Sequence, residues 1–70
     1  MILNQHQEAI TCFDRAIQIN PNDADAWYHK GWCLSQLNRR EEALACFAEA
    51  NRLKPSNKQF ADAVKEMQNS

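Results

Sequence analysis

Apolar residues recur along the chain in four segments, at the spacing of one helical face rather than the alternation of a strand. In the second segment, Trp27, Gly31 and Leu34 fall on one side of a helix at about 100° per residue. The stripes of the other segments are Ala9, Ile10, Phe13, Ala16 and Ile17; Ala43, Leu44, Phe47, Ala50 and Leu53; and Phe60, Val64 and Met67. The pattern predicts an all-α chain with helices at about 5–19, 24–37, 41–53 and 58–68, folded as an antiparallel stack of helix hairpins.

The predicted helix ends coincide with turn-forming residues. Asn20-Pro21-Asn22-Asp23 and Lys54-Pro55-Ser56-Asn57 each combine a proline with residues that favour turns, so neither segment continues a helix. The second helix is expected to begin after Asn22 or Asp23. The other three helices are expected to be capped by residues that have Gln or Glu three positions later, as in a capping box: Asn4, Asn38 and Ser56.

The segment from Leu3 to Pro21 repeats the segment from Leu37 to Pro55 at a fixed interval of 34 residues. The identical pairs are Leu3/Leu37, Asn4/Asn38, Glu8/Glu42, Ala9/Ala43, Cys12/Cys46, Phe13/Phe47, Ala16/Ala50 and Pro21/Pro55. A constant period of this length is typical of an array built from one supersecondary unit. Gly31, which costs about 1 kcal/mol relative to Ala inside a helix, is expected where a neighbouring helix crosses closely.

These residues resemble the tetratricopeptide repeat family, whose pattern is W-x₂-L-G-x₂-Y…A-x₃-F…P. The matching residues are Trp27, Gly31, Ala43, Phe47 and Pro55. The sequence departs from the pattern at Lys30, in place of Leu, and at Leu34, in place of Tyr. Lys30 is expected to lay its methylene stem along the helix seam and keep its charge in water.

The resemblance implies a single module over 1–70 with three parts. Residues 1–23 would be the second helix of a partial repeat, residues 24–57 a complete repeat, and residues 58–70 a closing helix. The resemblance also implies a right-handed stack in which the first helix of each pair lines a concave groove that binds a peptide or a protein. Some family members bind the acidic tail of heat-shock chaperones through a basic clamp, but the matching face here has no such clamp, so that activity is not expected.

The candidate partner-binding residues lie on the groove side of the second predicted helix: Asp25, Tyr28, His29, Trp32 and Gln36. Trp32 sits about 140° around the helix from Trp27, which the pattern assigns to the core. An outward aromatic side chain is a typical interface anchor, although Trp32 could equally pack on the first or last helix. Asp62 and Glu66 are expected to make the groove wall mildly acidic, favouring a neutral or basic ligand.

The alternative hypothesis is self-assembly, or structural spacing within a larger repeat protein, with dimerisation through the N-terminal helix. The helix that would precede it in a full repeat is not present in the sequence, so four of its apolar residues are expected to leave surface uncovered. Either the chain is a piece of a longer array, or two chains bury this surface in an isologous contact. The four residues are Ile2, Leu3, Ile10 and Ile17.

Composition excludes several other functions. The formal net charge of −1 argues against nucleic-acid binding, and no apolar run approaches the length of a membrane span. Cys12, Cys33 and Cys46 are expected to be reduced in a soluble, cytoplasmic chain, and Cys12 and Cys46, which share one repeat position, are expected to be small core-lining side chains. His6 and His29 have no second ligand at metal spacing, so we expect no metal, no cofactor and no catalytic residue.

Overall fold

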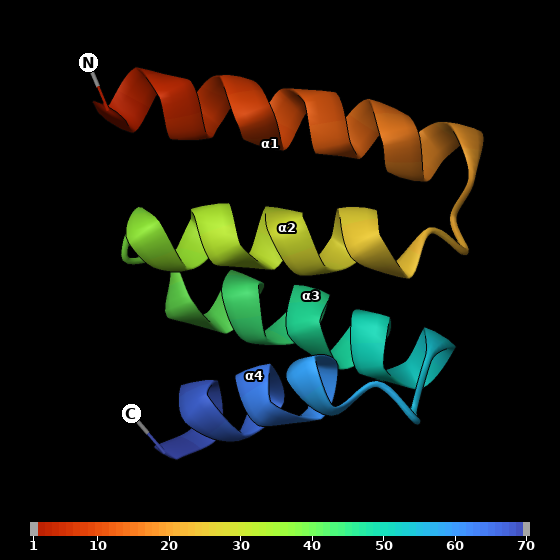
Figure 1. The fold of residues 1–70 in the computed structure, drawn as a ribbon. Helices are drawn as coiled ribbons and strands as arrows, with labels where there is room; N and C mark the ends of the chain where they lie inside the picture. The colour runs from red at the N-terminus through yellow and green to blue at the C-terminus, as the bar shows by residue number, and fades with distance from the viewer. Residues whose placement is uncertain (1, 70) are drawn as a thin grey trace.

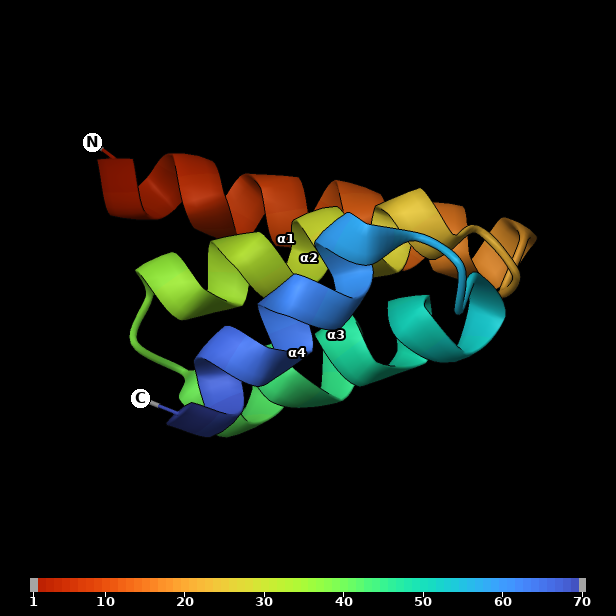
Figure 2. The same cartoon turned by 60° about the horizontal axis from the view of Figure 1, so that its bottom comes forward.

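The computed structural model describes the backbone of residues 2–69 and the side chains of residues 5–69. It contains four helices, α1 (Ile2–Ile19), α2 (Ala24–Gln36), α3 (Arg40–Leu53) and α4 (Lys58–Asn69). Each helix packs antiparallel to its predecessor, in chain order from α1 at one end to α4 at the other (Figure 1). The all-α stack of hairpins predicted from the sequence is therefore confirmed. Turning the molecule shows α4 crossing over α3 on the side that also faces α2 (Figure 2).

The 34-residue period is visible in the turns as well as in the sequence. The side chain of Asp23 accepts a hydrogen bond from the backbone N–H of Ala26 at 3.1 Å, and that of Asn57 accepts one from Phe60 at 3.3 Å. In both turns the backbone N–H of the capping residue donates to the carbonyl three residues earlier, at 3.0 Å. These bonds satisfy N–H groups that a helix start leaves unpaired. The turns that precede α2 and α4 thus have the same hydrogen-bonded structure.

Asn38 ends α2 instead of capping α3, so its expected role was wrong. Its φ of 63° is left-handed, a conformation that Asn tolerates better than most residues. The backbone N–H of the next residue, Arg39, donates to the carbonyl oxygen of Leu34 at 2.9 Å. The backbone N–H of Asn38 donates to the carbonyl oxygen of Ser35 at 3.1 Å. This pair of bonds is a Schellman motif, which satisfies the last carbonyls of α2. Arg39 takes the N-cap position of α3 without a side-chain cap bond.

The expected caps at Asn4 and Ser56 were also wrong. Asn4 lies inside α1, which begins at Ile2 because no Pro or Gly interrupts the first residues. Ser56 lies within the turn, and the capping bond is made one residue later by Asn57.

The core is centred on α2 and α3 and is closed by α4 at one end. Leu34 and Phe60 are its most completely enclosed large side chains. The ring of Tyr28 lies 5.5 Å from that of Phe47 and 5.1 Å from that of Phe60, which links the three helices. The indole N–H of Trp27 donates to the carbonyl of Pro21 at 2.9 Å, so its polar group is paired while its ring packs.

Two expectations about apolar residues of α1 were wrong. Ile10 was expected on exposed surface, but it is 8% exposed and packs in the core with Cys33 and Leu34. Cys12 was expected to line the core, but it is exposed, whereas its repeat equivalent Cys46 is buried. Both differences arise because α1 packs against α2 on one side only.

In the part of the chain that the structure describes, no helix is long and apolar enough to cross a bilayer.

Candidate functional site

The outward side of α2 carries most of the predicted partner-binding residues. Its inward side is occupied by core residues, among them Ala26, Gly31 and Leu34. At 3.6 residues per turn, the exposed residues of α2 gather along the opposite side of the helix. The exposed members of the predicted set are Asp25, His29, Trp32 and Gln36, and Tyr28 is half-buried. The structure thus brings all five together along one helix.

Trp32 is the largest exposed feature of this side of α2. The residue is 48% exposed, and its ring centroid lies 5.6 Å from that of His6 in an edge-on arrangement. His6 belongs to α1, so one edge of the indole is supported by the neighbouring helix. About half of the residue's surface remains open to solvent. The two interpretations of Trp32 considered above therefore both describe part of its environment.

Tyr28 and His29 differ in environment although they are neighbours. The ring of His29 stacks on Phe13 of α1 at 5.7 Å, with an interplanar angle of 23°. Tyr28 instead packs toward α4, 5.1 Å from Phe60, and its ring also lies 5.5 Å from His29. Tyr28 therefore belongs largely to the core, while His29 borders the open surface of α2.

A small hollow lies between α2 and α4, with a volume of about 170 Å³. Its lining residues are Tyr28, Gln59, Asp62, Ala63 and Glu66. Asp62 and Glu66 are one helical turn apart and both exposed. They adjoin the α2 surface at Tyr28, in the arrangement anticipated for an acidic groove wall.

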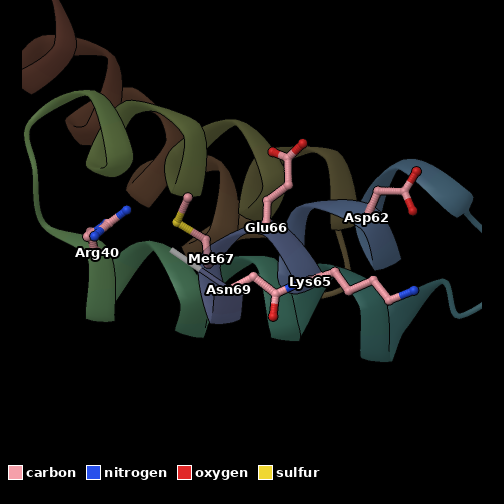
Figure 3. A pocket seen from close by; sticks show the side chains of 6 residues that line it. All are labelled: Arg40, Asp62, Lys65, Glu66, Met67 and Asn69. Atoms are coloured by element: carbon pink, nitrogen blue, oxygen red, sulfur yellow. The ribbon is translucent and has the colours of Figure 1, made fainter.

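A larger open hollow of about 620 Å³ lies between the start of α3 and the end of α4 (Figure 3). It is lined by Arg40, Asp62, Lys65, Glu66, Met67 and Asn69. Asp62 and Glu66 thus border both hollows, while Arg40 and Lys65 bring positive charge to this one. The position of Arg40 at this hollow could not be predicted from the sequence, because only the packing of α4 on α3 brings these distant segments together.

Of the four residues proposed for self-association, the two whose side chains the structure describes are not exposed. Ile10 is buried in the core and Ile17 is half-buried. The side chains of Ile2 and Leu3 lie outside the described residues. Ile19, which sequence reasoning missed, is 85% exposed at the end of α1. The 34-residue repeat could have identified it, because Ile19 is the equivalent of Leu53 in the stripe of the third helix.

Two of the three cysteines have thiols whose protonation is affected by burial. Burial raises the pKa of the Cys33 thiol, and burial likewise raises the pKa of Cys46, with Lys30 acting in the opposite direction. A raised pKa keeps both thiols protonated and unreactive at neutral pH. Among the described residues, no three His, Cys, Asp or Glu side chains gather in a group that could hold a metal ion.

Comparison with known proteins agrees with this geometry. The family model described as Tetratricopeptide repeat matches residues 3–69. The comparison with curated proteins finds no match to the sequence.

Proposed function

Because the chain belongs to the tetratricopeptide repeat family over residues 3–69, we propose that it is a protein–protein interaction module. Its partner is a peptide or a protein segment that binds across the exposed side of α2 and the adjoining side of α4. This is the side on which the family resemblance places the concave groove. No catalytic role is proposed, since repeats of this family are generally interaction modules.

The observation that carries the proposal is the setting of Trp32. Trp32 is 48% exposed, yet one edge of its ring packs against His6. A partly immobilised aromatic ring loses little conformational freedom on binding and offers a large apolar surface. Asp25, His29 and Gln36 surround it with polar groups, which supply the hydrogen-bonding rim of a typical interface.

The charge of the neighbouring surface selects the partner. Asp62 and Glu66 border the hollow beside Tyr28, and Asp25 is exposed on α2. Complementary charge favours the right partner mainly through faster association and rejection of like charge. The partner segment is therefore neutral or basic, with an apolar side chain for Trp32.

We propose that α4 closes the array on the side away from α1. Its positions equivalent to Trp27, Gly31 and Leu34 are Ala61, Lys65 and Gln68, all exposed. A polar outer face is what a terminal helix of a repeat stack requires for solubility. In the same division, residues 1–23 supply the second helix of a partial repeat and residues 24–57 the complete repeat.

Self-association as the main function is supported less well. Of the residues considered for it, Ile10 is in the core and Ile17 is half-buried.

The exposed, free thiol of Cys12 fits a reducing compartment, so a cytoplasmic location stays our prediction.

The test is selection from a displayed random-peptide library on the immobilised chain, followed by titration of the enriched peptides. Wild-type chain should enrich peptides with an apolar residue near basic ones, and Trp32→Ala should weaken them by about tenfold or more. Ile19→Ala is the matched control, because Ile19 is also exposed and apolar but lies on α1. Its affinity should equal that of the wild type. Equal affinity of all three proteins, or no enrichment over bare support, would contradict the proposal.

A further inference from the structure

The exposed side of α2 and the adjoining side of α4 carry equivalent positions that differ in chemistry. The interval of 34 residues relates Tyr28 to Asp62 and Trp32 to Glu66. In both pairs an aromatic residue on α2 is replaced by a carboxylate on α4. A ligand that crosses from α2 to α4 therefore passes from an aromatic surface to an acidic one.

The hollow of about 170 Å³ between α2 and α4 lies where these two surfaces meet. Tyr28 lines it from α2, and Asp62 and Glu66 line it from α4. Figure 3 shows both carboxylates extending from the same side of α4, whereas the ammonium group of Lys65 extends in a different direction. The ion pairs of the described side chains use other carboxylates, so none of them neutralises Asp62 or Glu66. The hollow thus offers uncompensated negative charge to a ligand.

The chemistry of the hollow favours an arginine side chain. Asp62 and Glu66 stand at positions i and i+4 of α4, a spacing at which Cβ atoms lie about 5–6 Å apart. A guanidinium group carries its donors in a planar fork, so it reaches both carboxylates at once, and it stacks on aromatic rings such as that of Tyr28. The ammonium group of a lysine is a more strongly hydrated point charge. Arginine is therefore the better occupant.

The separation of α2 and α4 sets the spacing of anchors on the ligand. Packed helices lie about 8–10 Å apart, and the rings of Tyr28 and Phe60 join these two helices with their centroids 5.1 Å apart. In a polyproline II segment, residues i and i+3 face the same side about 9 Å apart, because there are three residues per turn. A β-strand instead places residues i+2 and i+4 on the side of residue i, at about 7 and about 13 Å. Of these spacings, that of the polyproline II segment matches the two helices.

We propose that the partner binds as a polyproline II segment with an apolar residue on Trp32 and an arginine three residues away. The arginine occupies the hollow between Tyr28, Asp62 and Glu66. It precedes or follows the apolar residue according to the direction in which the segment crosses the helices. This inference rests on the proposed function, to which it adds the conformation of the ligand and the spacing of its two anchors.

The probes are nine-residue synthetic peptides of proline and serine that contain one leucine and one arginine. The arginine stands two, three or four residues from the leucine, on either side. Amide chemical shifts of the isotope-labelled chain measure the affinity of each peptide. One peptide with a spacing of three should bind about threefold or more tightly than those with spacings of two and four, as expected for exposed charge pairs. This preference should vanish at about 1 M salt, where screening acts over about 3 Å.

Variants of the chain and of the peptide together identify the contact. Glu66→Gln and Asp62→Asn should each weaken the best arginine peptide. Neither should change the affinity of the same peptide with citrulline, which has the shape of arginine without its charge. Glu8→Gln is the matched control, because Glu8 is an exposed carboxylate on α1, and it should leave both affinities unchanged.

Three results would overturn the inference. The first is equal affinity at all spacings or tightest binding at a spacing of two or four. The second is an equal loss for the arginine and citrulline peptides in the α4 variants, and the third is no binding by any peptide of the series. The proposed function is judged separately, by whether library-selected peptides bind and lose affinity with Trp32→Ala, so the two fail independently.

Discussion

The ammonium group of Lys30 lies 2.6 Å from the carboxylate of Asp14, and this ion pair joins α2 to α1. The Lys30 side chain is 23% exposed, and its Nζ lies 5.8 Å from the centre of the Trp27 ring. The methylene stem of Lys30 is thus largely covered between α1 and α2, while its ammonium group pairs with the carboxylate of Asp14 at the border of this contact. This accounts for a lysine at a position where the family pattern has leucine.

The ion pair between Lys30 and Asp14 is predicted to contribute modestly to stability. In a double-mutant cycle with Lys30→Met and Asp14→Asn, the coupling energy should be below about 1 kcal/mol, since Asp14 is half exposed. Urea unfolding of the four proteins at low and high salt measures it. Because salt screens exposed pairs, the coupling should shrink at high ionic strength. A large coupling energy that does not change with salt would contradict the description of the Lys30–Asp14 pair as a partly exposed, modestly stabilising contact.

Gly31→Ala is predicted to destabilise the fold despite the higher helix propensity of alanine. The propensity gain is about 1 kcal/mol, but overpacking of a tight core costs about 1–3 kcal/mol. The new Cβ would approach the Phe47 ring to 2.8 Å, and Phe47 is only 4% exposed, so it has little room to yield. Denaturant unfolding should show a net loss, and Phe47→Leu in the same chain should relieve part of it. An increase in stability for Gly31→Ala alone would show that the crossing is looser than described.

The two equivalent turns are predicted to respond alike to loss of their caps. Asp23→Ala and Asn57→Ala should each cost about 0.5–2 kcal/mol of unfolding free energy, because each leaves a helix-start N–H unpaired. Asn22→Ala is the control, since the side chain of Asn22 makes no cap bond to α2 in the described structure. Thermal and denaturant unfolding measure all three. A control as damaging as the cap variants would refute the role of the side-chain bonds.

The buried thiols are predicted to make stability fall at alkaline pH. Burial raises the pKa of Cys33 and Cys46 above the ordinary 9.0, so the unfolded chain loses these protons first. Fewer bound protons in the unfolded state mean that stability is full below about pH 9 and declines as pH rises toward the folded pKa values. Unfolding free energies of wild type and of Cys33→Ala/Cys46→Ala at pH 8 and pH 10 measure this. The double variant should show the smaller decline, and an equal decline would show that other groups cause it.

The helices could be predicted from sequence because their apolar spacing and turn residues agree. The start of the second helix could be predicted only as following Asn22 or Asp23, and the structure shows that Asp23 makes the capping bond. Asn38 was misassigned because Asn serves both as an N-cap and as a left-handed helix end, and only the backbone path decides between them.

The candidate surfaces could be predicted less completely, because burial depends on which helices are present. Cys12 and Cys46 occupy the same repeat position, yet one is exposed and the other is buried. Helical periodicity places Ile10 on an apolar face but does not say that this face meets α2. Likewise, nothing local indicates that Arg40 approaches the end of α4.

The most direct test of the proposed binding face is amide chemical-shift mapping of a library-selected peptide on the isotope-labelled chain. The peptide should perturb residues around Trp32 and Gln36 on α2 and around Asp62 and Glu66 on α4, and Trp32→Ala should remove these shifts. Perturbations confined to the outer side of α3, or shifts unaffected by Trp32→Ala, would contradict the assignment of this face as the partner-binding surface.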